Sequence, residues 1–377
     1  MSTTSLDLAS ADEASSRLGI SRASLYAYVS RGLIRSFSSP HDPRQRLYAV
    51  ADVEMLVERK ARFRRPAVAA ATALDWGLPV LETSITQIRD GRLFYRGQDA
   101  IALSRTAPLE ETTRLLVGGL TEDPFLNRSP IPAPLPGPAV GLHRFVAQAV
   151  RLLAEPARRE TRAAEVAAIL RLMAAAATGT DPGTERLHEH LARAWEVPSQ
   201  ATDAIRRALV LCADHELSSS AFAVRVTAST GASLRNAVIA GLAALSGPYH
   251  GGMTERVRAF LDAPGAAPSP GFRHRLYPDG DPRARALLEN LPLLASDATT
   301  LKAIANASSG GPSVDVALVM MERAYGLPFG TAFTVFAIGR TAGWLAHAIE
   351  QRSQAALIRP RARYVAADEP PARTAPP

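Results

Sequence analysis

The amino-acid sequence predicts a mainly α-helical protein with more than one domain. Aromatic residues make up only 6% of the 377 residues, while alanine and leucine are abundant, and this balance favours closely packed helices over strands. From about residue 98 to about residue 355, helical patterns dominate and proline-rich breaks separate them. Hydrophobic residues make up 47% of the chain, which is ordinary for a globular protein with a large core.

The composition argues against several classes of protein. The single cysteine, Cys212, cannot form an intramolecular disulfide, and its apolar helical surroundings predict a small buried side chain. No stretch approaches the ~18 uninterrupted apolar residues that a membrane span needs. The start of the chain has no basic region followed by an apolar core, so it does not resemble a secretory signal. We therefore expect a cytoplasmic protein with no membrane partner.

Residues 8–65 have the pattern of a compact helical unit. A first helix is predicted to begin with Asp12 and Glu13, because anionic side chains suit a helix N-terminus, and to end at Gly19. Ser21 can cap the N-terminus of the second helix. The inward face of that helix is predicted from residues three and four positions apart: Leu25, Tyr28 and Val29.

The rest of this unit is a polar stretch followed by a third helix. The polar stretch, Ser36 to Gln45, is expected to be irregular, and the helix is expected to start near Asp52 with Val53, Leu56 and Val57 as its apolar stripe. Residues 1–65 hold eleven Lys and Arg against seven Asp and Glu, within a net charge of +7 for the whole chain. Such a basic end can meet phosphate groups or simply be solvated, so charge alone decides nothing.

The order of helix, tight turn, helix, polar loop and helix predicts a helix-turn-helix with a wing. Its residues resemble the DNA-binding head of MerR-family regulators and excisionases, from Asp12-Glu13-Ala14 through Gly32-Leu33-Ile34 to Arg46-Leu47-Tyr48. The resemblance implies that the second helix enters the major groove and that the wing meets the DNA backbone. The residues that would face DNA are Arg22, Tyr26, Arg44 and Arg46. Alternatively, the unit no longer binds DNA and serves docking or dimerisation.

A second and larger unit is predicted to follow a linker at residues 66–75. It opens with a short irregular or hairpin segment, Gly77–Ile85 and Leu93–Gly97, before the helical patterns begin. The last segment, residues 366–377, is rich in proline, alanine and charge and is expected to be disordered.

Three of the eight histidines lie in unusual sequence surroundings. His215 follows an aspartate, His250 precedes two glycines, and His274 lies in a segment that begins with glycine. Glycine beside a histidine lets a ligand approach the backbone. For each of the others, a surface or satisfied core role is the more probable assignment: His41, His143, His188, His190 and His347. The special three lack metal-ligand spacing, so no metal site is expected.

Two other kinds of catalytic site are not supported by the sequence. A serine hydrolase would need a G-x-S-x-G turn, and a dinucleotide-binding protein would need its glycine fingerprint; neither motif is present. Seven motifs within about residues 75–365 instead resemble the citrate synthase family. In chain order they are Gly77–Ile85 with Leu93–Asp99, Asp214–Leu217 with Phe222–Thr230, Gly247–Gly252, Gly271–Tyr277 with Asp281–Ala284, Ser313–Asp315, Gly339–Arg340 and Arg359–Arg361.

The resemblance implies condensation of acetyl-CoA or propionyl-CoA with oxaloacetate, giving citrate or 2-methylcitrate and CoA, with no cofactor. By resemblance Asp315 is the base, His250 donates to the thioester oxygen and His274 polarises the keto carbonyl. The residues that would bind the keto acid are His215, Arg283, Arg340 and, from the other subunit of a homodimer, Arg359. Guanidinium groups suit carboxylates because they bind them through two parallel hydrogen bonds.

The implied body has a large helical domain, residues 76–251 and 326–365, and a small one, residues 252–325, with the active site in the cleft between them. The sequence departs from the family pattern at four places: Ser218-Ser219-Ser220, Arg273, Ser313 and Val316-Ala317-Leu318. The alternative function is a DNA-binding transcription regulator whose citrate-synthase-like body senses a keto acid or an acyl-CoA.

Overall fold

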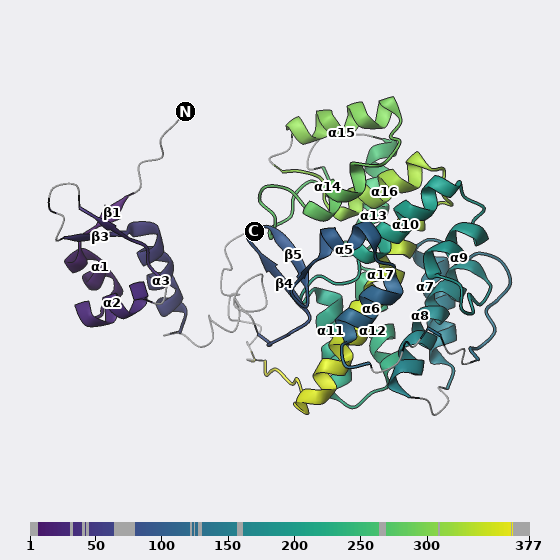
Figure 1. The fold of residues 1–377 in the computed structure, drawn as a ribbon, viewed down its shortest axis with the longest axis horizontal. Helices are drawn as coiled ribbons and strands as arrows, with labels where there is room; N and C mark the ends of the chain where they lie inside the picture. Colours follow the sequence, from purple (N-terminus) through teal and green to yellow (C-terminus); the bar gives the residue numbers. More distant parts are fainter. Residues whose placement is uncertain are drawn as a thin grey trace. The chain divides into compact units, whose positions relative to one another are not determined.

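A computed structural model of the chain describes residues 7–30, 33–39, 42, 45–63, 80–120, 123, 125–126, 130–156, 161–263, 269–307, 310–362 and 364. The chain forms two compact units, a head of residues Met1–Glu82 and a body of residues Thr83–Pro377, which we describe separately (Figure 1). The predictions made for Gly32, Arg44, the linker at residues 66–75 and the tail at residues 366–377 lie outside the described residues.

The head combines helices with a small antiparallel sheet of strand order β1-β3-β2. Its elements are β1 (Leu8–Ala9), α1 (Ala11–Leu18), α2 (Arg22–Ser30), β2 (Ser36–Ser38), β3 (Arg46–Ala49) and α3 (Val50–Phe63). Ser10 and Glu13 form a reciprocal capping box at the start of α1, and Gly19 ends the helix in the left-handed conformation at φ 59°. The predicted bounds of the first helix are therefore confirmed.

The core of the head forms as the periodicity predicts. Leu25 and Val53 are fully buried, and Tyr28 and Val29 pack partly buried against the same cluster. The prediction of an irregular stretch from Ser36 to Gln45 is wrong at its start, because Ser36–Ser38 pairs with β3 as a strand. Backbone hydrogen bonds can pair two strands without a particular side-chain pattern. A short edge strand with two serines therefore lacks the apolar pattern from which a strand could be predicted.

The body opens with a three-stranded antiparallel sheet of order β4-β5-β6: β4 (Thr86–Arg89), β5 (Arg92–Tyr95) and β6 (Gln98–Asp99). The turn between the first two strands has Asp90 at φ 53° and Gly91 at φ 69°. Two consecutive residues with positive φ give the tight turn that matches the twist of paired strands. An irregular segment or a hairpin was predicted here from Gly77–Ile85 and Leu93–Gly97. A hairpin is present and its second strand overlaps the second segment, but its first strand follows Ile85, and residues 80–85 form no strand. Residues 77–79 lie outside the described residues.

All other regular secondary structure described in the body is helical, and the last helix ends at residue 354, close to the predicted end near residue 355. The helices are α5 (Ala100–Thr106), α6 (Leu109–Val117), α7 (Leu142–Ala154), α8 (Arg162–Thr178), α9 (Leu187–Ala194), α10 (Ser199–Leu211), α11 (Ser219–Ser229), α12 (Leu234–Leu245), α13 (Met253–Asp262), α14 (Pro282–Leu288), α15 (Ala295–Ala307), α16 (Val314–Ala324) and α17 (Thr331–Gln354). None of the helices described is long and apolar enough to cross a bilayer.

Helix α17 is the central element of the body. All its residues from Thr331 to Ala348 are buried, so it is covered on every side rather than along one stripe. It packs against α6, α11, α12 and α10, and Figure 1 shows it passing between these helices. Cys212, at the end of α10, is fully buried as predicted. Side chains that α17 carries are therefore held in fixed positions by close packing.

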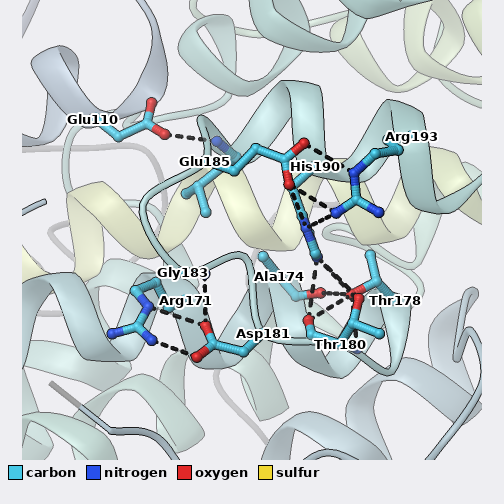
Figure 2. Close-up of polar contacts among 11 residues, drawn as sticks. Glu110, Arg171, Ala174, Thr178, Thr180, Asp181, Gly183, Glu185, His190 and Arg193 are labelled. Carbon is cyan, nitrogen blue, oxygen red and sulfur yellow. Dashed lines mark hydrogen bonds and ion pairs between the residues drawn. The ribbon is translucent and has the colours of Figure 1, made fainter. Parts of the chain in front are cut away.

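A buried polar network joins α8 to α9 (Figure 2). The ring of His190 is fully buried, with Nδ1 3.2 Å from Glu185 Oε2 and Nε2 3.0 Å from Thr178 Oγ1. Arg193 donates to both Glu185 and His190, and all these partners lie close in sequence. His190 is thus a satisfied core histidine, as expected, and its network fixes the turn between the two helices.

Candidate active site

Three aromatic side chains from two separate segments meet in the body. His215 lies between α10 and α11, while His274 and Tyr277 lie between α13 and α14. His215 Nε2 is 3.0 Å from the Tyr277 hydroxyl oxygen. The ring centroids of His215 and His274 are 5.2 Å apart at an interplanar angle of 83°, and those of His274 and Tyr277 are 5.0 Å apart. Two of the three singled-out histidines are therefore direct neighbours.

His250 approaches the site on a tight turn before α13. A Cβ at Gly252 would lie 2.6 Å from the Ser246 carbonyl oxygen, so the turn can close only with glycine there. The imidazole Nε2 of His250 is 2.8 Å from Ser220 Oγ. The ring of His250 also contacts that of Phe336 at 6.2 Å between centroids, and the Arg340 guanidinium lies 5.0 Å from the same Phe336 ring. Phe336 thus links His250 to Arg340.

Arg283 is held at the start of α14 by a buried ion pair. Its Nε and Nη2 donate to the two carboxylate oxygens of Asp281 at 3.0 and 2.8 Å, and its guanidinium lies 5.7 Å from the Tyr277 ring centroid. Asp281 Oδ2 also accepts from the Val314 backbone nitrogen at 3.0 Å. Since Val314 begins α16, this one carboxylate ties the starts of two helices together and orients the guanidinium between them.

Asp315 lies in the first turn of α16. Ser313 occupies the N-cap position of that helix, and its hydroxyl donates to Asp315 Oδ2 at 3.1 Å, while Oδ1 is buried and has no hydrogen-bond partner among the residues that the structure describes. Burial raises the pKa of Asp315 to about 6, against the opposing effect of the Arg283 charge. A carboxylate with this pKa is ionised at neutral pH and is a stronger base than an ordinary aspartate.

The candidate histidines are neutral at pH 7. Burial, followed by the charges of Arg340 and Arg283, lowers the pKa of His250 to about 3. Burial and the Arg283 charge lower the pKa of His274 to about 4, and burial with Arg283 and His274 lowers that of His215 well below its usual value. A neutral imidazole carries one N–H donor, so each ring can donate one hydrogen bond without adding charge.

Arg340 carries a buried positive charge into this group. Its side chain is 1% exposed, its Nε donates to the Cys212 carbonyl oxygen at 2.8 Å, and Nη1 lies 3.4 Å from Ser218 Oγ. Within the described part of the chain it forms no ion pair with a carboxylate. Burying a guanidinium without a counter-charge is costly, and an anionic ligand bound beside it would remove that cost.

The structure does not bring every predicted residue into this cluster. Arg359 follows α17 in a segment that is neither helix nor strand, with its side chain exposed. In the head, Arg22 forms an ion pair with Asp12, Tyr26 is 53% exposed, and Arg46 is exposed with Nη1 3.4 Å from Ser38 Oγ. The fourth predicted DNA-facing residue, Arg44, lies outside the described residues.

Three residues of the cluster were given no role from the sequence. Ser220 belongs to a serine run that counted only as a departure from the family pattern, and Asp281 and Tyr277 were quoted only as parts of motifs. Their roles depend on contacts with His250, Arg283 and His215 from other segments, which the sequence alone does not reveal. Within the described residues, no group of three or more His, Cys, Asp or Glu side chains is arranged to hold a metal ion.

The chain resembles known proteins in both sequence and fold. The profile of a family described as "Citrate synthase, C-terminal domain" matches residues 143–361. The chain is 32% identical over 192 residues to citrate synthase 2 of Bacillus subtilis and 29% identical over 188 residues to 2-methylcitrate synthase 1 of Corynebacterium glutamicum. These matches cover 44% and 43% of this chain and 52% and 49% of the relatives. The chain thus matches about half the length of these curated relatives.

The fold is also similar to solved structures. Citrate synthase from Thermotoga maritima superposes with a TM-score of 0.64 at 23% identity, over 78% of this chain and 95% of the other. A citrate synthase of Thermoplasma acidophilum, solved in a ternary complex with carboxymethyl coenzyme A and oxaloacetate, superposes with a TM-score of 0.60 at 24% identity, over 78% of this chain and 95% of the other. At these identities the likeness establishes the fold.

Proposed function

The chain belongs to the citrate synthase family, and we propose that it condenses an acyl-CoA with a 2-keto dicarboxylic acid and releases CoA. Acetyl-CoA or propionyl-CoA with oxaloacetate, giving citrate or 2-methylcitrate, fits the names of the relatives. The observation that carries the proposal is the buried Arg340 guanidinium, which has no carboxylate partner among the described residues and whose charge acts on two neutral histidines, His215 and His250. Such a site suits an anionic ligand whose carbonyl group accepts hydrogen bonds.

Enolate formation is the first step of the proposed reaction. Asp315 removes a proton from the carbon next to the thioester carbonyl, and its buried Oδ1 is the oxygen that is free to accept it. With the Ser220 hydroxyl donating to His250 Nε2, the imidazole proton sits on Nδ1, which then donates to the developing enolate oxygen. Because His250 is neutral, it stabilises this oxygen by donating a hydrogen bond and not by a positive charge on the ring.

Carbon–carbon bond formation is the second step. The enolate carbon attacks the keto carbonyl, which His274 polarises, while Arg283 and Arg340 bind the two carboxylates of the keto acid. His215 adds a further hydrogen bond. Water then cleaves the thioester of the condensed product, so that its acyl carbon becomes a carboxylate and the sulfur leaves as CoA thiol. No cofactor takes part in these steps.

Assembly belongs to the same proposal. Arg359 is exposed in this chain, and an exposed arginine can reach a neighbouring subunit. In the proposed homodimer, Arg359 of each subunit completes the keto-acid site of the other. The division of the body into a large domain, residues 76–251 and 326–365, and a small one, residues 252–325, would then allow the cleft to close and exclude water from the enolate.

The head has features that support a second function, DNA binding. The helices α1 and α2 joined at Gly19, with the β2–β3 hairpin after them, have the order of a winged helix-turn-helix, and Tyr26 and Arg46 are exposed. In this proposal α2 enters the major groove and the hairpin is the wing. Arg22 would first have to leave Asp12, with which it pairs in the free protein. A dimer would present two such heads to a pseudo-palindromic site.

A thiol-reagent assay of CoA release tests the enzymatic proposal. Purified full-length protein is mixed with acetyl-CoA or propionyl-CoA, with and without oxaloacetate. Release that requires both substrates supports the proposal. If the wild-type protein binds oxaloacetate but releases no CoA with either thioester, the proposal fails and the body is a metabolite sensor for the head.

A further inference from the structure

Helix α17 contacts the three consecutive residues that precede His215 in the chain: Cys212, Ala213 and Asp214. Arg340 Nε donates to the Cys212 carbonyl oxygen at 2.8 Å, and the Gly343 backbone nitrogen donates to the Ala213 carbonyl oxygen at 2.9 Å. One turn further along, His347 Nε2 lies 3.3 Å from Asp214 Oδ1. The spacing of the three α17 residues places them along one face of the helix, so that each holds the next residue of the segment.

Glycine permits this close approach of the helix to the segment. A Cβ at Gly343 would collide with Asp214 Oδ1, and a Cβ at Gly339 would lie 2.5 Å from the Leu209 carbonyl oxygen. Any side chain at these two positions would push α17 away from residues 209–214. The contact between His347 and Asp214 therefore depends on the same tight packing that brings Arg340 to Cys212.

The Asp214–His347 pair is fully closed to solvent, since both side chains are 0% exposed. Burial alone would raise the pKa of Asp214, but His347, and after it Arg340, lower it below its ordinary value. The Asp214 backbone nitrogen also donates to the Tyr95 hydroxyl at 3.3 Å. A buried carboxylate between an imidazole and a guanidinium is costly to retain without a role, and none of the proposed steps uses it directly.

The residue after His215 is constrained as well. Glu216 adopts the left-handed conformation at φ 50°, which is strained for a non-glycine residue, and its carboxylate accepts from the Ile88 backbone nitrogen at 2.8 Å. His215 is thus fixed from both sides, by Asp214 before it and Glu216 after it. This fixed backbone holds its imidazole against Tyr277 and His274.

We propose that His347 is a positioning residue for the keto-acid site: through Asp214 it fixes the backbone and ring of His215 without touching the ligand. This inference rests on the proposed function, because the keto acid is the ligand that His215 serves. The loss of the His347 imidazole would leave the buried Asp214 carboxylate without this 3.3 Å contact and free the segment to shift. Binding of the keto acid would weaken, whereas acyl-CoA, which His250 and Asp315 serve, would be affected much less.

The test compares three variants of the full-length protein. His347→Leu removes the polar ring at similar volume, and His347→Gln keeps a side-chain N–H group. His190→Leu is the matched control, because it removes another fully buried histidine that pairs with a carboxylate (Figure 2). The polar partners of His190 in that network are Thr178, Thr180, Glu185 and Arg193, and His215 is not among them. The readouts are the oxaloacetate Kd by titration calorimetry, the KM of each substrate, and Tm.

We expect His347→Leu to raise the oxaloacetate Kd about tenfold and to leave the acyl-CoA KM within about twofold. His347→Gln should retain most of the wild-type affinity for oxaloacetate. His190→Leu should lower Tm and leave the oxaloacetate Kd unchanged. Equal oxaloacetate Kd values for His347→Leu and the wild type, or equal losses in His190→Leu, would overturn the inference. Should His347→Leu not fold, Asp214→Asn, which keeps the size of the side chain, is expected to show the same selective rise in Kd.

These measurements distinguish failure of this inference from failure of the proposed function. Calorimetry measures oxaloacetate binding without turnover. If the wild-type protein binds no oxaloacetate, the proposed function fails, and the inference fails with it. If the wild type binds oxaloacetate and releases CoA while His347→Leu behaves identically, only the inference fails.

Discussion

Ser313 Oγ donates a hydrogen bond of 3.1 Å to Asp315 Oδ2 at the start of α16, and this is the only hydrogen bond that another described side chain gives to the proposed base. It stabilises the carboxylate form, while burial disfavours that form and raises the pKa of Asp315 to about 6. The balance of these two effects determines the pH range in which Asp315 can accept a proton.

The pH profile of kcat/KM should therefore have an acidic limb near pH 6. Asp315 must be ionised to act as a base, so activity is lost as the pH falls through its pKa. Ser313→Ala removes the hydrogen bond that favours the carboxylate and should move this limb to higher pH. The measurement is CoA release from pH 5 to pH 8. A limb that stays in place in Ser313→Ala would mean that another group titrates.

Replacing the base itself should have a larger effect. Asp315→Ala is expected to lower kcat by roughly 10²–10⁴-fold, the usual contribution of a positioned base, with little change in the oxaloacetate Kd. Steady-state CoA release and calorimetry measure the two quantities. Unchanged turnover in Asp315→Ala would remove the residue from the mechanism.

Arg359 provides a test of the shared site. Asp315→Ala and Arg359→Ala should each be poorly active alone, but a mixed dimer would contain one site with both native residues. Random exchange of subunits should then restore activity at about a quarter of the sites. No recovery on mixing, or a monomer by light scattering at micromolar concentration, would exclude Arg359 from the site.

The head should bind duplex DNA with an affinity that falls steeply as salt rises, because phosphate neutralisation releases counterions. Arg46→Ala should weaken binding to all sequences alike, whereas Arg22→Ala should relax sequence preference. Asp12→Ala frees Arg22 from its ion pair and should strengthen binding. Gel shifts with the promoter region of the protein's own gene and with random duplex measure these effects. A protein that shifts neither DNA at low salt has a head with another role.

Acid should destabilise the body through its buried histidines. Burial, together with Arg206, lowers the pKa of His188 to about 4 in the folded protein, against about 6.5 in the unfolded chain. Between these values the unfolded chain binds more protons, so stability falls as the pH falls from about 6.5 to about 4. His188→Gln should reduce this slope, as measured by urea unfolding at several pH values. An unchanged slope would show that His188 is not one of the groups responsible.

Local sequence patterns predicted much of the fold. Helix ends with clear chemistry, such as Glu13 and Gly19 in α1, were found because capping depends on neighbouring residues. The third helix of the head starts at Val50, two residues before its predicted start near Asp52, because the chain passes directly from β3 into the helix. The family resemblance was found from short motifs, each of which lies within one segment of the chain.

Contacts between distant segments could not be predicted in the same way. His347 was expected to have a surface or satisfied core role, and it lies in the core, but its contact with Asp214 depends on the packing of α17 and could not be predicted. The apolar run Val316-Ala317-Leu318, which departs from the family pattern, is fully buried, and its place in the core explains its apolar character. A polar residue whose partner lies far away in the chain leaves no periodic signal in the sequence.

The proposed reaction forms a carbon–carbon bond between a thioester enolate and a keto acid. The most direct measurement is the fate of acetyl-CoA labelled with ¹³C at its methyl carbon, followed by NMR in the presence of oxaloacetate. We expect the label to appear in a methylene carbon of citrate as CoA is released. Labelled free acetate, or unchanged acetyl-CoA beside bound oxaloacetate, would contradict it.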